Sequence, residues 1–119
     1  MTIKRLSLGR AGEDQAAQYL KDMGYIIVER NYRCRLGEID IVARDGPVMV
    51  FVEVRTRSGS GFGTALESVV YKKQLKVRQV ASQYLQHREC FGGPVRFDVL
   101  ALTLVPGSAA EVEHVKNAF

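Results

Sequence analysis

Apolar residues recur at helical spacing near the start of the chain and again in its second half. The first stripe predicts a helix from about Ser7 to Met23, with Ser7 as its cap and Gly24 as its stop. Its apolar positions are Leu8, Ala11, Ala16, Tyr19, Leu20 and Met23. A second helix is predicted from about Ala65 to Gln86, with an apolar side formed by Leu66, Val69, Val70, Val77, Val80, Ala81 and Tyr84.

Short apolar or alternating segments between and after these helices are typical of β-strands. We predict strands at Tyr25–Tyr32, Arg35–Arg44, Val48–Arg57, Val95–Val105 and Glu111–Lys116. The turn Asp45-Gly46-Pro47 joins the second of these strands to the third. The segment Ser58–Gly63 is predicted to be a connecting or active-site loop. The order of helix, three strands, helix and two strands predicts one α/β domain over residues 1–119, with a mixed sheet and a helix on at least one face.

Composition narrows the class of protein. The 119 residues are 46% hydrophobic and 25% charged, which suits a single folded domain. No apolar run approaches the ~20 residues of a membrane span, and the N-terminal segment lacks the apolar stretch of a signal peptide, so we expect a cytoplasmic protein without a membrane partner. The net charge of +4 permits a polyanionic partner but does not require one.

The cysteines and histidines are sparse. Cys34 and Cys90 fit no metal-ligand spacing, and we expect small buried or half-buried side chains rather than a disulfide. His87 and His114 are isolated in the sequence, so a zinc site is not expected.

Carboxylates interrupt the apolar pattern of the second and third predicted strands. With the turn at Asp45–Val48, Asp40 faces Glu53 across the antiparallel pair. Side chains opposed in this way have Cβ atoms about 4.5–5.5 Å apart, and two like charges there repel. Protonation of one carboxylate or a cation between them would relieve the repulsion. Mg²⁺, which binds few protein carboxylates and keeps several waters, suits such a pair.

Three further charged residues are expected near Asp40 and Glu53. Arg55 lies two residues after Glu53 and therefore points to the same face of the sheet, as Glu38 does with Asp40. Glu13 lies on the core-facing side of the first helix, where Gly12 would let the backbone approach the sheet closely.

Each of these charges also has a purely structural interpretation. Asp40 with Arg55, or Glu53 with Arg57, could be ordinary ion pairs on a solvent-facing sheet. Glu13 could be a surface carboxylate near the favourable end of a helix. Two further alternatives are that Glu38 pairs with Arg44 or Arg35, and that Asp98 forms a salt bridge with Arg96 or another arginine rather than supplying a fourth acid.

Four motifs together cover much of the chain. They are GRAGEDQAAQYLKDMGY (Gly9–Tyr25), ERNYRCRLGEIDIVARDG (Glu29–Gly46), VFVEVRTR (Val50–Arg57) and RFDV (Arg96–Val99). On these motifs the chain resembles the YraN-type family of small bacterial proteins. That family is similar in turn to archaeal Holliday-junction resolvases and to restriction-endonuclease-like nucleases of the PD-(D/E)xK type. The resemblance implies a restriction-endonuclease-like αβββαβ core.

The resemblance also implies roles for individual residues. Asp40 falls on the first acidic position of the nuclease motif, Glu53 on the second, Glu13 on the helix glutamate and Arg55 on the lysine. Asp40, Glu53 and the backbone carbonyl of Val54 would hold Mg²⁺ or Mn²⁺. Two positions depart from the motif: Ile39 precedes Asp40 in place of proline, and Arg55 cannot lose a proton as a lysine can.

These expectations lead to two main functional hypotheses. The first is a Mg²⁺-dependent endonuclease that hydrolyses phosphodiester bonds in branched or damaged DNA. The second is a non-catalytic nucleic-acid-binding module with a degenerate nuclease site, and a third reading is a protein-interaction scaffold. The expected nucleic-acid contacts are Arg33, Arg35, Arg57 and Lys73, which would touch phosphates. A homodimer would suit a two-fold junction substrate.

Overall fold

A computed structural model describes residues 3–58, 69–90 and 92–119, with side chains from residue 11 onwards except that of Ser58. Helix α1 (Ile3–Asp22) is followed by strands β1 (Ile26–Cys34), β2 (Gly37–Asp45) and β3 (Val48–Ser58), then by helix α2 (Tyr71–His87) and strands β4 (Val95–Leu104) and β5 (Glu111–Val115). Within these residues the strands form one sheet in the order β1-β2-β3-β4-β5. The predicted α/β class and the order of its elements are confirmed.

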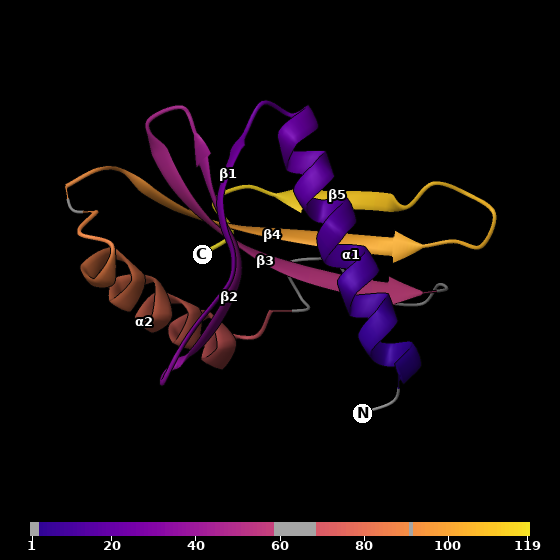
Figure 1. Cartoon of the computed structure of the whole chain (residues 1–119), viewed down its shortest axis with the longest axis horizontal. Coiled ribbons are helices and arrows are strands. Elements are labelled where there is room, and N and C mark those ends of the chain that lie inside the picture. Colours follow the sequence, from indigo (N-terminus) through magenta and orange to yellow (C-terminus); the bar gives the residue numbers. More distant parts are fainter. Residues whose placement is uncertain (1–2, 59–68, 91) are drawn as a thin grey trace.

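The sheet is mixed because one pair of neighbouring strands runs parallel. β3 and β4 are parallel, and the other three pairs are antiparallel. A parallel pair needs a long crossover connection, and α2 lies in the crossover between these two strands. In Figure 1, α1 crosses the strands β3 and β4, whereas α2 lies beside the β1–β2 hairpin, in agreement with the contacts of each helix.

Alternation along the strands separates two cores. The α1-side core joins the buried Ala16 and Leu20 of the helix to Val50, Val52 and Leu100 of the sheet, together with their neighbours. The α2-side core contains Val77, Val80, Ala81 and Tyr84 of the helix with Tyr32, Ile39, Val42, Phe51 and Phe97 of the sheet. Odd-numbered residues of β3 therefore face α2, and even-numbered residues face α1.

Both helices begin at positions that the sequence pattern placed wrongly. α1 starts at Ile3, so Ser7 lies inside the helix instead of capping it. α2 starts at Tyr71, because Val70 is extended at φ −69° and ψ 161°. Val69 is buried, but against Val99 and Ala101 of β4 rather than on a helix face. The predicted start at residues 65–68 and most of the Ser58–Gly63 loop lie outside the described residues.

Three exposed side chains correct the predicted stripes. Ala11, Met23 and Val70 were expected in the core and are exposed. Met23 and Val70 lie just outside the ends of α1 and α2, whereas Ala11 lies inside α1 on its exposed side. Cys34 and Cys90 are free and half-buried, as predicted. Neither described helix has the length and apolar character needed to cross a membrane.

Gly12 allows α1 to approach β3 very closely. A Cβ atom built at Gly12 would overlap Thr56 Oγ1 and lie 2.8 Å from Thr56 Cβ. The predicted close approach at Gly12 is therefore confirmed. Thr56 is held in a strand that pairs with β4, so the helix itself must shift to admit a side chain.

Gly12→Ala is expected to lower the free energy of unfolding by about 1–3 kcal/mol, although alanine is the better helix former. Urea unfolding measures the change. Gly93→Ala is the matched control, because a Cβ at Gly93 meets nothing within 4 Å. A Gly12→Ala variant as stable as the wild type would show that α1 shifts without cost.

Candidate functional site

The acidic cluster forms where β2 and β3 part. Their register runs from Asp45 opposite Val48 to Ile41 opposite Val52, as the turn predicts. Asp40 and Glu53, the next pair expected, are not ladder partners. Instead, the backbone N–H of Val54 donates a hydrogen bond to Asp40 Oδ2 at 2.8 Å. The carboxylate of Asp40 therefore takes the place of a backbone acceptor and is directed at β3.

A twist in β2 explains why the pairing ends there. Ile41 and Ala43 pack in the α1-side core, and strict alternation would put Ile39 with them. Ile39 packs in the α2-side core with Tyr32 instead. The strand therefore rotates at Asp40, which brings this side chain to the gap between the two strands.

Glu53 is the buried acid of the cluster. It is 5% exposed and lies on the side of β3 that faces α2, because Phe51 packs in the core on that side. Lys73 Nζ of α2 lies 3.4 Å from its Oε1. Its other oxygen, Oε2, is buried without a hydrogen-bond partner in the described part of the chain. An unpartnered buried carboxylate oxygen is costly and is the place where a cation would bind.

Two further side chains with unpartnered buried atoms lie near Asp40, one on α1 and one on β3. Glu13 of α1 has a buried Oε1 without a partner among the described residues, and Arg55 of β3 likewise has a buried Nε. Burial and the carboxylate of Asp40 raise the pKa of Glu13 above its ordinary value. Glu13 therefore lies in the field of Asp40.

The electrostatics of Asp40 and Glu53 favour a positive partner. Burial, and then the charge of Asp40, raise the pKa of Glu53 to about 7. Burial also raises the pKa of Asp40, against the opposing hydrogen bond from Val54. Lys73 and Arg55 lower both values without restoring them to normal. The two nearby cations thus leave part of the negative charge uncompensated.

The structure brings Asp40, Glu53 and Arg55 within electrostatic reach of one another. Glu13 comes within reach of Asp40, but it lies on α1, whereas Glu53 and Arg55 are on the side of β3 that faces α2. The structure adds Lys73, which the sequence placed only among the nucleic-acid contacts. The ion pairs considered as alternatives do not form among the described side chains: Glu53 pairs with Lys73, and Arg57 with Glu113 at 3.7 Å. The helical spacing of Lys73 from Val77 and Val80 was the available signal for its position.

The other predicted nucleic-acid contacts lie apart from this cluster or are already engaged. Arg57 Nε donates to Thr103 Oγ1 at 3.2 Å. Arg33 Nε lies 3.1 Å from Glu38 Oε2, so Glu38 pairs with Arg33 rather than with either predicted arginine. Arg35 is exposed at the tip of the β1–β2 hairpin.

Asp98 belongs to a different site on the α1 side of the sheet. It lies opposite Val52 of β3 in the register and is fully buried. Arg96 donates to it from Nε at 2.9 Å and His114 Nε2 lies 2.8 Å away, so the predicted Asp98–Arg96 salt bridge is confirmed. The sequence did not indicate His114, because the pairing of β5 with β4 creates this contact.

The donor set of the acidic cluster fits a hard divalent cation. Carboxylate oxygens are the ligands that Mg²⁺ and Mn²⁺ prefer, and Glu53 Oε2 is free to accept one. Among the described residues, no three Asp, Glu, His or Cys side chains form a ligand group. A cation held by Asp40 and Glu53 would therefore complete its shell with backbone oxygen and water.

The fold and the cluster define a class of small α/β protein with a mixed sheet and a buried acidic cluster on its central strands. The chain belongs to the uncharacterised protein family UPF0102, whose model matches residues 12–102. This agrees with the YraN-type resemblance. UPF0102 proteins of Moorella thermoacetica and Desulforamulus reducens are 52% and 48% identical over 120 and 122 aligned residues. The alignments cover 100% and 99% of this chain and the same shares of those proteins.

Proposed function

We propose that this protein is a Mg²⁺- or Mn²⁺-dependent endonuclease that hydrolyses phosphodiester bonds in branched or damaged DNA. The observation that carries the proposal is that the buried Glu53 lies within electrostatic reach of Asp40 and Arg55 and has one unpartnered oxygen. Glu13 of α1 lies in the field of Asp40. Folding keeps Asp40 near both glutamates although burial, together with the charge of Asp40, raises the pKa values of Glu13 and Glu53. Perturbed carboxylates gathered in this way are characteristic of functional sites.

The side chains would divide the work according to their charge and burial. Asp40 and Glu53, with the backbone carbonyl of Val54, would hold the cation, which when bound lowers the pKa of water and neutralises phosphate charge. Glu13 has an unpartnered oxygen with which to accept a proton or orient a water. Arg55 stays positive at every relevant pH and would stabilise charge on the scissile phosphate. Lys73 compensates Glu53 until substrate approaches.

A second candidate is a DNA-binding module that has lost catalysis. The specific observation in its favour is Arg55 at the position where the related nucleases carry lysine. Because a guanidinium keeps its proton, Arg55 cannot help to deprotonate the attacking water. The fold and its cationic surface would be retained for binding.

Cleavage assays separate the two candidates. The wild type is expected to cut a four-way DNA junction with Mg²⁺ or Mn²⁺, and Asp40→Asn to reduce the rate by about 100-fold or more, as expected when a metal ligand is removed. The exposed Asp22→Asn is the matched control and should cut normally. Equal cutting by Asp40→Asn and the wild type would assign the activity to a contaminant and contradict the proposal.

Arg55→Lys tests the second candidate directly. If the site is degenerate only at this residue, the wild type will bind the junction without cutting it, and Arg55→Lys will cut it.

The partner and oligomeric state belong to the same proposal: a junction-cutting enzyme is expected to bind as a homodimer, which light scattering of the protein–junction complex measures.

A further inference from the structure

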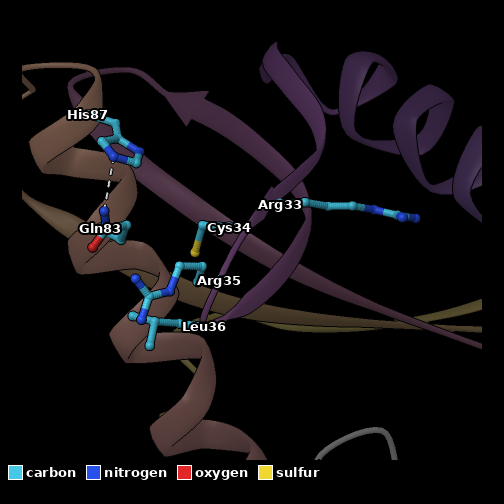
Figure 2. A pocket seen from close by; sticks show the side chains of 6 residues that line it. All are labelled: Arg33, Cys34, Arg35, Leu36, Gln83 and His87. Carbon is cyan, nitrogen blue, oxygen red and sulfur yellow. Dashed lines mark hydrogen bonds between the residues drawn. The ribbon is translucent and has the colours of Figure 1, made fainter.

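A pocket lies between the β1–β2 hairpin and α2, away from the acidic cluster. Its volume is about 490 Å³, within the range of ligand-binding pockets. Arg33, Cys34, Arg35 and Leu36 of the hairpin and Gln83 and His87 of α2 line it. Figure 2 shows the Arg35 side chain lying beside α2, whereas Arg33 leads away from the helix. Arg33 is also engaged with Glu38, so Arg35 is the cation available to a ligand.

The polar wall of this pocket is held in place. Gln83 Nε2 and His87 Nε2 are 2.9 Å apart, and Tyr32 OH lies 2.8 Å from His87 Nδ1. These contacts use the amide nitrogen of Gln83 and leave its carbonyl oxygen for a hydrogen bond from a ligand. Leu36, which is 41% exposed, and the half-buried Cys34 provide an apolar wall. An anchored amide beside an apolar surface suits the edge and face of a nucleobase.

A line of positive charge connects the pocket with the acidic cluster. α2 carries Lys72, Lys73 and Lys76 and has no aspartate or glutamate, while its Arg78 lies over the Phe97 ring and is not part of this line. Lys73 lies against Glu53 at one end of this line. The stem of Lys76 runs beside Gly37 of the hairpin, with its Cγ 3.6 Å from where a Cβ of Gly37 would be. An anionic strand at the cluster would therefore meet cations along the helix as far as Arg35.

The length of α2 sets the spacing between the two sites. Gln83 and His87 follow Lys73 by ten and fourteen residues, which correspond to about 15–21 Å along the helix axis. A DNA strand advances about 3.4 Å per nucleotide in a duplex, so the separation corresponds to roughly four to six nucleotides.

We infer that this pocket binds one unpaired nucleotide of the DNA strand, about four to six nucleotides from the bond held at the acidic cluster. Arg35 binds its phosphate, Gln83 the edge of its base, and Leu36 and Cys34 the face of the base. A paired base cannot enter the pocket, because it is stacked inside the duplex. The inference rests on the proposed function and deepens it, since it names the DNA structure that this site selects.

Binding measured in EDTA tests the pocket without cleavage. The probes are a fluorescent duplex of about 20 base pairs with a single-stranded flap and the same duplex fully paired. Arg35→Ala and Gln83→Leu are each expected to weaken flap binding by about tenfold and duplex binding by no more than about twofold. Lys21→Ala, which removes an exposed charge at the end of α1, is the matched control. Equal weakening of both probes by Arg35→Ala would reduce Arg35 to a general phosphate contact and overturn the inference.

Alkylation of Cys34 gives a second measurement that needs no pocket substitution. In a Cys90→Ser background, the flap probe is expected to slow modification of Cys34 by iodoacetamide by about fivefold or more, and the paired duplex to leave it nearly unchanged. Cleavage of DNA without protection of Cys34 would overturn the pocket alone. Protection of Cys34 without any Mg²⁺- or Mn²⁺-dependent cleavage would keep the pocket and overturn the nuclease.

Discussion

Asp98→Ala is expected to destabilise the protein by about 3–5 kcal/mol, the usual cost of removing one partner from a buried ion pair. Asp98 is fully buried and accepts hydrogen bonds from Arg96 Nε, Arg96 Nη2 and the backbone N–H of Asn117, while His114 Nε2 lies 2.8 Å away. Its removal leaves the arginine, which is only 17% exposed, without its main counter-charge. The network also joins β4 to β5, so both strands lose support.

Thermal unfolding of Asp98→Ala measures this effect. A loss of this size corresponds to a Tm lower by roughly 10–20 °C for a domain near this length. Asp98→Asn keeps an acceptor and should lose less, and the exposed Asp22→Ala should leave the Tm within about 2 °C of the wild type. A Tm for Asp98→Ala close to that of the wild type would show that the network contributes little net stability.

The same carboxylate contributes to acid sensitivity. Burial raises the pKa of Asp98, but the hydrogen bonds from His114 and Arg96 outweigh burial and hold it below its ordinary value of 3.8. A lowered pKa means that the unfolded chain binds this proton more readily than the folded chain. Its contribution to stability is therefore complete above the unfolded pKa and is lost as pH falls through the folded one. In urea titrations, Asp98→Asn should lack this part of the acid dependence.

Glu53→Gln is expected to raise the free energy of unfolding, in contrast to Asp98→Ala, and to abolish cleavage. Burial and Asp40 raise the pKa of Glu53 from 4.5 to about 7. Between these values the folded chain binds the proton and the unfolded chain releases it. Stability therefore falls as pH rises from about 5 to about 7 in the absence of a divalent cation. Glutamine removes the buried charge, and we expect a net gain of about 1–2 kcal/mol at pH 8, part of the gain being offset by the lost pair with Lys73.

Thermal unfolding in EDTA at pH 5 and pH 8 checks this prediction. The Tm of Glu53→Gln should exceed that of the wild type by about 4–10 °C at pH 8 and by much less at pH 5. Adding Mn²⁺ should raise the Tm of the wild type and not that of the variant, because only the wild type keeps both carboxylates. Glu111→Gln, at an exposed position, is the control. A variant less stable than the wild type at pH 8 would mean that the pair with Lys73 outweighs repulsion and burial.

The strand register could be predicted because it depends on short-range features. A two-residue turn at Gly46-Pro47, with Gly46 at φ 59°, sets the pairing of β2 with β3, and the alternating apolar residues continue it. The prediction was wrong only one residue further, at Asp40. There the strand rotates, and Ile39 packs in the α2-side core. The alternation of apolar residues along the strand does not indicate this rotation.

The sequence by itself determined the α/β class, the order of the elements and the proximity of Asp40, Glu53 and Arg55, since period-two alternation and one tight turn act over neighbouring residues. Only the tertiary structure decided that Lys73 lies against Glu53, that Glu13 shares the field of Asp40 and that a pocket forms beside Arg35. These contacts depend on how each helix packs on the sheet. Packing is fixed by the shapes of both surfaces together, and those shapes exist only after distant segments have come into contact.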